Sequence, residues 1–159
     1  MVKYLETAVT FEEIPDEVTL AINISNCQNH CEGCHSPWLR EDVGEELTPE
    51  VLNDLIDKNE GITCVCFMGE GNDIEGLLDL ALIVAQRGLA AALYSGRPDV
   101  EAELGAVFTY LKEGPYIEEF GPLNKETTNQ RMYKVHHKVN GDDLELEFED
   151  ITYKFWRRG

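Results

Sequence analysis

Short apolar runs alternate with helical patterns along the middle of the chain, and this alternation restricts the possible folds more than any other feature. The predicted strands cover residues 18–24, 62–68, 89–94 and 107–111. The predicted helices cover residues 49–58, 73–87 and 100–104. Strands that alternate with helices favour a parallel sheet with right-handed crossovers. We therefore predict an α/β fold with a mostly parallel sheet, and 159 residues suit a partial, open barrel better than a complete eight-fold one.

The C-terminal part of the chain has a different pattern. Residues 133–139 and 144–148 flank Asn140-Gly141, a pair that is typical of a tight turn in a β-hairpin. In the second of these runs, leucine and phenylalanine alternate with glutamate, so one face is apolar and the other acidic. We predict a C-terminal hairpin over residues 133–156, with its acidic face exposed to solvent. Docking of a partner on this edge is the alternative interpretation.

Composition and charge restrict the number of domains, the possible partners and the location of the protein. We expect a single domain over residues 1–159, with a core from about residue 18 to residue 133. The net charge of −18, from 31 acidic and 13 basic residues, argues against nucleic acid and against anionic membranes as partners. Residues 1–6 lack the apolar core of a signal peptide, and no apolar run has the length of a membrane span. A cytoplasmic location is therefore expected.

Three of the five cysteines lie within eight residues, directly after the first predicted strand. Cys27, Cys31 and Cys34 have the spacing C-x₃-C-x₂-C, which suits three irons of a [4Fe–4S] cluster and leaves the fourth iron without a protein ligand. A zinc site that adds His30 or His35 is an alternative, and a chance cluster of free thiols is another. Structural zinc sites usually combine two separated pairs of ligands, however, and the chain has no second pair of this kind.

The two remaining cysteines have a different predicted role. Cys64 and Cys66 alternate within an apolar strand, so their side chains point to the same face. We expect both to be core residues rather than metal ligands.

The cysteine spacing after a first strand resembles that of the radical S-adenosylmethionine superfamily. Gly33 and the following His35-Ser36-Pro37-Trp38 resemble the activating proteins of glycyl radical enzymes, in particular those of anaerobic (class III) ribonucleoside-triphosphate reductases. Four later segments also resemble motifs of this family, in the same order: Met68-Gly69-Glu70-Gly71, Tyr94-Ser95-Gly96, Leu111-Lys112-Glu113-Gly114-Pro115-Tyr116-Ile117 and Thr128-Asn129-Gln130-Arg131. The first of them corresponds to a Gly-Gly-Glu-like motif, in which Met68 replaces the first glycine. The similarity extends from about Val18 to Tyr133.

The resemblance implies a radical-SAM β/α barrel in partial form and a set of cofactor-binding residues. It implies that Cys27, Cys31 and Cys34 hold a [4Fe–4S] cluster. It also implies that S-adenosylmethionine is bound by Gly33, Cys34, His35, Gly69, Glu70 and Ser95. Within this set the carboxylate of Glu70 is expected to bind the amino group of the methionine moiety.

The implied function is that of a glycyl radical enzyme activase. Electrons from a flavodoxin-like donor would drive reductive cleavage of S-adenosylmethionine to a 5′-deoxyadenosyl radical. That radical would abstract hydrogen from a glycine of a large partner, the anaerobic ribonucleoside-triphosphate reductase. Two alternatives stay open, namely a radical S-adenosylmethionine enzyme that acts on another protein or a small molecule, and a non-catalytic zinc-binding interaction module.

Overall fold

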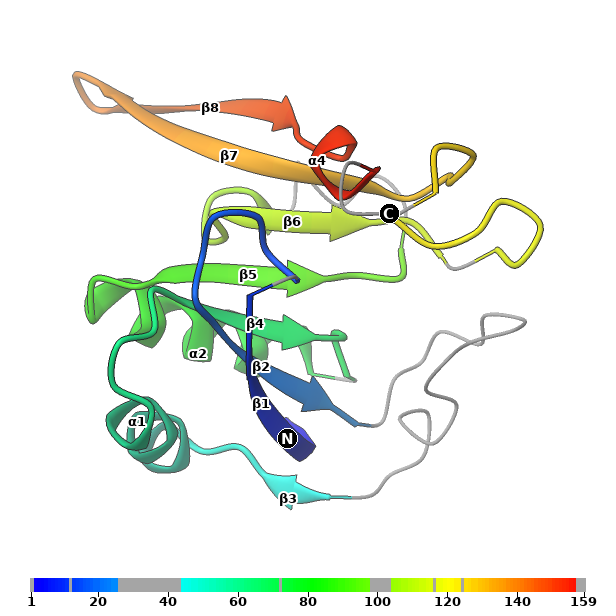
Figure 1. The fold of residues 1–159 in the computed structure, drawn as a ribbon. Coiled ribbons are helices and arrows are strands. Elements are labelled where there is room, and N and C mark those ends of the chain that lie inside the picture. Colours follow the sequence, from blue (N-terminus) through cyan, green and yellow to red (C-terminus); the bar gives the residue numbers. More distant parts are fainter. Residues whose placement is uncertain are drawn as a thin grey trace.

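The computed structural model describes residues 2–11, 13–25, 44–71, 73–97, 104–115, 117–123 and 125–156. These residues form a mixed α/β fold with one open sheet in the order β3-β1-β2-β4-β5-β6-β7-β8 (Figure 1). The strands are β1 (Lys3–Thr10), β2 (Thr19–Ile24), β3 (Glu45–Glu46), β4 (Cys64–Met68), β5 (Ala90–Tyr94), β6 (Tyr110–Glu113), β7 (Arg131–Asn140) and β8 (Asp143–Asp150). The helices are α1 (Pro49–Lys58), α2 (Ile74–Gln86) and α4 (Tyr153–Trp156).

Parallel pairing is confined to the centre of the sheet. Strands β2, β4, β5 and β6 are parallel to one another, and the other four pairings within the described part of the chain are antiparallel. The strands predicted at 18–24, 62–68 and 89–94 are confirmed as β2, β4 and β5. The strand predicted at 107–111 begins later, as β6 at Tyr110. The sheet is therefore less parallel than predicted.

Strand β1 is the main element that the sequence did not predict. It pairs antiparallel with β2, and its register shifts between Tyr4 and Thr7, as at a β-bulge. Its residues are exposed or half-buried along its whole length, so neither face carries a consistent apolar pattern. An alternation that is this weak gives no period-2 signal from which a strand could be recognised.

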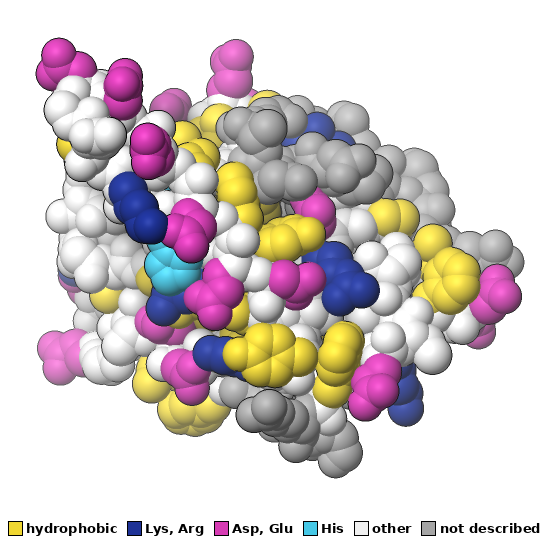
Figure 2. All heavy atoms as spheres, turned by 90° about the horizontal axis from the view of Figure 1, so that it is seen from above, with side chains coloured by type: hydrophobic (Ala, Val, Ile, Leu, Met, Phe, Trp, Pro, Cys, Tyr) yellow, Lys and Arg dark blue, Asp and Glu magenta, His cyan; other side chains and the backbone are white. Residues whose placement is uncertain are grey.

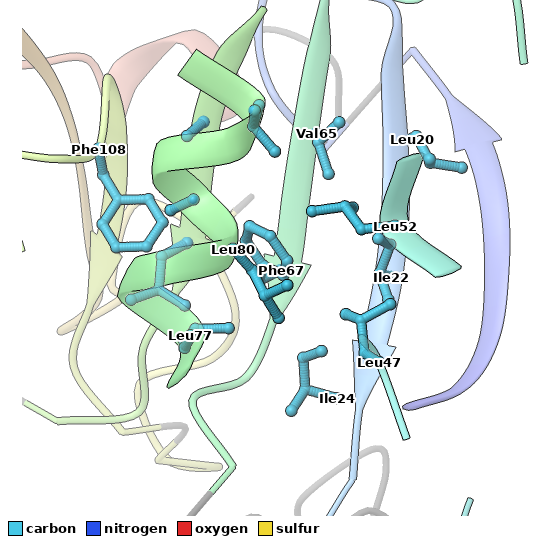
Figure 3. Close-up of a cluster of buried hydrophobic side chains, with 14 of the residues drawn as sticks. Leu20, Ile22, Ile24, Leu47, Leu52, Val65, Phe67, Leu77, Leu80 and Phe108 are labelled. Carbon is cyan, nitrogen blue, oxygen red and sulfur yellow. The ribbon is translucent and has the colours of Figure 1, made fainter. Parts of the chain in front are cut away.

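Helices α1 and α2 cover one face of the sheet and form the larger core with it (Figure 3). Leu52 of α1 and Leu77 of α2 are fully buried against side chains of β2 and β4. Phe67 and Phe108 meet edge to face in this core, with ring centroids 6.5 Å apart. Both helices begin at a capping side chain: Thr48 Oγ1 accepts from Val51 N, and Asp73 Oδ1 accepts from Gly76 N.

The opposite face of the sheet is covered by irregular segments and by α4. Ile14 is fully buried there, in a smaller core with Cys66, Met132 and Phe155. The segment 13–18 is held across β5 and β6, because Tyr94 Oη donates to Glu13 O and Tyr110 Oη donates to Glu17 Oε2 at 3.1 Å. Figure 1 shows this segment passing in front of the two strands.

Strands β7 and β8 form the predicted C-terminal hairpin, with a turn one residue later than expected. The hairpin spans residues 131–150 rather than 133–156, because the last four residues of the predicted range form α4. Asn140 pairs with Asp143, so the connecting residues are Gly141 and Asp142. Gly141 has a φ of +67°, a backbone conformation that glycine adopts without strain.

The acidic side chains of β8 are matched by basic side chains of β7. Lys138 pairs with Glu147, and His136 Nε2 lies 3.0 Å from Glu149 Oε1. Figure 2, which looks at the molecule from above, shows acidic side chains interleaved with lysine and histidine over this region. The hairpin therefore presents mixed charges rather than a purely acidic face.

Candidate functional site

The carboxyl ends of the four parallel strands lie at one edge of the sheet (Figure 1). The register aligns Asn23, Met68, Tyr94 and Lys112 in a row across β2, β4, β5 and β6. Directly after this row come the segments that the sequence analysis selected. Loops at the carboxyl ends of parallel strands are where α/β folds bind their ligands.

The loop after β4 turns sharply at two glycines that flank Glu70. Gly69 and Gly71 have φ angles of +114° and +67°, which favour glycine over any residue with a Cβ atom. A Cβ on Gly71 would lie 3.0 Å from Ile24 Cγ2 and 3.3 Å from Ser25 O. The loop therefore packs directly against the end of β2, from which the chain continues into the cysteine segment.

Glu70 is a buried carboxylate with three hydrogen bonds. It is 8% exposed, and its side chain accepts from Arg97 through both oxygens: Oε2 lies 2.7 Å from Arg97 Nε, and Oε1 lies 2.9 Å from Arg97 Nη2. Ser95 Oγ, which is fully buried, donates to Glu70 Oε1 at 3.0 Å. A two-point contact of this kind between guanidinium and carboxylate is strong and fixes the direction of both groups.

A second buried charge stabilises the loop ends beside this pair. Lys112 is 8% exposed, and its Nζ donates to Ser95 O at 3.3 Å and to Gly114 O at 3.2 Å. The same ammonium lies 5.8 Å from the centroid of the Tyr94 ring. Because it binds carbonyl groups after β5 and after β6, Lys112 links the two loops to each other.

The remaining motif segments join the same network. Gly114 N donates to Arg97 O at 2.9 Å, which connects the segment after β6 to the segment after β5. Gln130 Nε2 donates to Gly114 O at 3.4 Å, and Asn129 Nδ2 donates to Pro115 O at 3.0 Å. Four segments that are separated in the sequence, 69–71, 95–97, 113–115 and 128–130, therefore meet at one edge of the sheet.

Part of the predicted site can be located in this arrangement. Gly69, Glu70 and Ser95 lie together, as a cofactor site that uses all three requires. The predicted cluster ligands Cys27, Cys31 and Cys34 lie outside the described residues, as do Gly33 and His35. Arg131 is the last residue of the fourth motif, and its Nη1 atom lies 3.6 Å from Asp150 Oδ2.

Sequence reasoning missed two charged residues of the site, Arg97 and Lys112. Arg97 directly follows the Ser95-Gly96 pair that was selected, but its partner Glu70 is 27 residues away and belongs to another strand end. Lys112 had a usable signal, because a lysine that continues an apolar strand is unusual unless its charge is paired.

Cys64 and Cys66 are core residues, as predicted. Both side chains are fully buried on the face that carries Ile14, and Cys66 Sγ lies 3.6 Å from Met68 Sδ. Burial raises the pKa of the Cys64 thiol to about 12 and raises that of Cys66 well above its ordinary value. Within the described ranges, no three His, Cys, Asp or Glu side chains are grouped as metal ligands would be.

The carboxylate of Glu70 fits the amino group that the resemblance assigns to it. A carboxylate offers about four lone-pair positions, and the three bonds named above leave room for a further donor.

Comparison of the chain with protein-family models, with curated proteins and with solved structures found no match. In the part of the chain that is described, no helix has the length and apolar character needed to cross a membrane.

Proposed function

We propose that this protein is a radical S-adenosylmethionine enzyme that activates a glycyl radical enzyme, with an anaerobic ribonucleoside-triphosphate reductase as its partner. The observation that carries the proposal is the meeting of four motif segments at the carboxyl edge of β2, β4, β5 and β6. Three of these segments are far apart in the sequence, and no local rule of secondary structure requires them to converge. The order of the parallel strands brings them to one edge, and the buried charges and hydrogen bonds that they share there support a common binding site.

The position of the end of β2, after which the cysteine segment follows in the sequence, supports the same function. The chain enters that segment from Ile24 and Ser25, which contact the loop Gly69-Glu70-Gly71. A cluster held by Cys27, Cys31 and Cys34 would follow directly from the strand that borders Glu70. When bound, the [4Fe–4S] cluster and S-adenosylmethionine supply the electron transfer and the 5′-deoxyadenosyl radical.

The chain's own residues bind and orient the cofactor in this proposal. Glu70 accepts a hydrogen bond from the amino group of the methionine moiety, and Ser95 fixes the orientation of the Glu70 carboxylate. Lys112 holds the carbonyl groups of Ser95 and Gly114, which keeps the loops after β5 and β6 in place. Gly33 and His35, which lie outside the described residues, would line the adenine.

Glycyl radical formation tests the activase assignment. The reduced, iron-loaded protein is mixed under anaerobic conditions with S-adenosylmethionine and an anaerobic ribonucleoside-triphosphate reductase, and the electron paramagnetic resonance spectrum is recorded. We expect the doublet of a glycyl radical on the reductase. Cleavage of S-adenosylmethionine without a doublet on any glycyl radical enzyme would instead favour a radical enzyme with another substrate.

The metal content separates these functions from a zinc-binding interaction module. A structural zinc site has a closed set of four ligands, whereas a cluster that binds S-adenosylmethionine has three protein ligands and one open iron. Stoichiometric zinc that is not replaced by iron and sulfide under anaerobic conditions would contradict the proposal. It would favour the interaction module.

A further inference from the structure

Strand β8 is the last strand of the sheet in the part of the chain that is described, so its outer edge faces no further strand there. We propose that this edge binds an extended segment of a partner protein as an additional strand, and that in this segment lysine or arginine alternates with apolar residues. Such binding requires neither S-adenosylmethionine nor a cluster, so it goes beyond the function proposed above. The strand also lies beyond the similarity to the radical S-adenosylmethionine family, which ends at about Tyr133.

The backbone of β8 has an outer row of hydrogen-bonding groups. Ile151 N donates to Met132 O at 2.9 Å, so these two residues belong to a hydrogen-bonded pair of the antiparallel ladder. Such pairs alternate along the ladder, and the register therefore directs the backbone groups of the odd-numbered residues of β8 toward β7. The N–H and C=O groups of Leu144, Leu146 and Phe148 point the other way. They form the row of donors and acceptors that an added strand requires.

The outer half of the hairpin is a two-stranded ribbon. Strand β6 pairs with β7 from Arg131 to Lys134, and Figure 1 shows the turn of the hairpin lying beyond the start of β6. Val139 and Leu144, which are cross-strand partners near the turn, are 79% and 50% exposed. A two-stranded hairpin is at best marginally stable in water, whereas three strands with an apolar face can be stable. An added strand would therefore stabilise this part of the hairpin.

The charges along β8 select the kind of segment that fits. Acidic side chains occupy the face opposite the leucines, and each of them is exposed: Asp143, Glu145, Glu147 and Glu149. The basic side chains that pair with this row come from β7, on the inner side of β8. A strand added on the outer side places its own side chains beside the same row, where lysine or arginine forms favourable cross-strand pairs. Its alternate residues extend the apolar face of the hairpin.

A second copy of the chain does not fit this edge. Every register that keeps the apolar side chains of two β8 strands on one face places the acidic side chains of one copy beside those of the other. Like charges opposite each other destabilise a sheet, and charged edge strands prevent the pairing of identical chains. The net charge of −18 adds repulsion between copies. The edge is thus protected against self-association but matches a cationic strand.

Binding of designed peptides tests the proposal. The probe is a peptide of the length of β8 in which lysine alternates with valine, and its dissociation constant is measured at physiological ionic strength. We expect the peptide to protect the amides of Leu144, Leu146 and Phe148 from hydrogen exchange, followed by nuclear magnetic resonance. Since one edge of the peptide faces β8, N-methylation of one alternate set of backbone nitrogens should weaken binding about 10-fold or more. N-methylation of the other set should weaken it less than about three-fold.

Charge variants separate this edge from the overall charge of the protein. Asp143→Asn/Glu145→Gln removes two charges of the acidic row, leaves the ion pairs between β7 and β8 intact, and should weaken peptide binding about five-fold. Glu60→Gln/Asp79→Asn is the matched control, because both residues are exposed and lie near α1 and on α2, and it should change binding less than about two-fold.

Three results would overturn the proposal. Equal weakening by the two double variants, or equal effects of the two N-methylated peptides, would show that the peptide binds through net charge alone. Dimers of the chain in sedimentation experiments without peptide, with the same amides protected, would assign the edge to a second copy.

Discussion

At the scale of single residues, the site depends on contacts between side chains that are distant in the sequence. Glu70 was selected because Met68-Gly69-Glu70-Gly71 resembles a Gly-Gly-Glu-like motif, and the two glycines of this segment adopt positive φ angles. Its partner Arg97 could not be deduced in the same way, since nothing in the local sequence shows which strand ends become neighbours. The order of the strands in the sheet, which places β4 next to β5, brings the two residues together.

We expect the Glu70–Arg97 pair to contribute to stability without any ligand. Glu70→Ala removes three hydrogen bonds that involve a charged group and should lower the free energy of unfolding by about 2 kcal/mol. Urea denaturation measures this change. Glu147→Ala is the control, because Glu147 forms an exposed ion pair with Lys138 and its removal should have no measurable effect. Equal stability of Glu70→Ala and the wild-type protein would contradict the contribution of the pair.

The buried thiols should be unreactive in the folded protein. With a pKa of about 12, Cys64 is almost entirely protonated at pH 8, and Cys66 is fully buried. Treatment with iodoacetamide, followed by mass spectrometry of the peptides, should show modification of both residues only in denaturant. Labelling of Cys64 or Cys66 under native conditions would contradict their burial in the core.

At the scale of the elements, local signals predicted the parts of the fold that carry them. Helices α1 and α2 were predictable because apolar side chains recur at helical spacing after Thr48-Pro49 and after Asp73. Strand β1 lacks such a signal, since it forms an edge region with exposed or half-buried residues throughout. The start of β6 was misjudged because Phe108 is fully buried although it precedes the strand.

The cap of α2 should give a dependence of stability on pH. The hydrogen bond from the Gly76 amide lowers the pKa of Asp73 in the folded protein. The ionised Asp73 side chain therefore stabilises the fold fully above the unfolded pKa of about 3.9, and this stabilisation is lost as the pH falls through the lower, folded pKa. At pH 7, Asp73→Ala should cost about 1 kcal/mol. Urea denaturation at pH 7 and at pH 3 should show a smaller difference between variant and wild type at the lower pH. A difference that does not change with pH would contradict the role of the ionised cap.

The glycine turn beside Glu70 can be tested through its contact with β2. Gly71→Ala places a Cβ atom in the left-handed region and 3.0 Å from Ile24, so it should destabilise the fold by more than the roughly 1 kcal/mol of backbone strain alone. Gly88→Ala is the matched control, with a similar φ of +77° and nothing within 4 Å of the added atom. Equal unfolding free energies for the two variants would show that the loop at Gly71 does not pack closely against the end of β2.

At the scale of the whole molecule, the topology of the sheet determines what can be built at its edge. Four parallel strands in the order β2-β4-β5-β6 bring their carboxyl ends together, and antiparallel strands complete the sheet on both sides. The alternation of strands and helices in the sequence predicted the parallel centre. It did not predict the antiparallel flank formed by β1, because a strand without a face pattern cannot be assigned to a neighbour.

The central claim is that Cys27, Cys31 and Cys34 hold a [4Fe–4S] cluster that cleaves S-adenosylmethionine, and anaerobic reconstitution tests it most directly. Iron, sulfide, zinc and 5′-deoxyadenosine are measured on the wild-type protein, on Cys31→Ala and on the double variant Cys64→Ala/Cys66→Ala. We predict one cluster per chain and formation of 5′-deoxyadenosine in the wild-type protein and in the double variant, and loss of both in Cys31→Ala. Wild-type protein that holds zinc and takes up neither iron nor sulfide would contradict the claim.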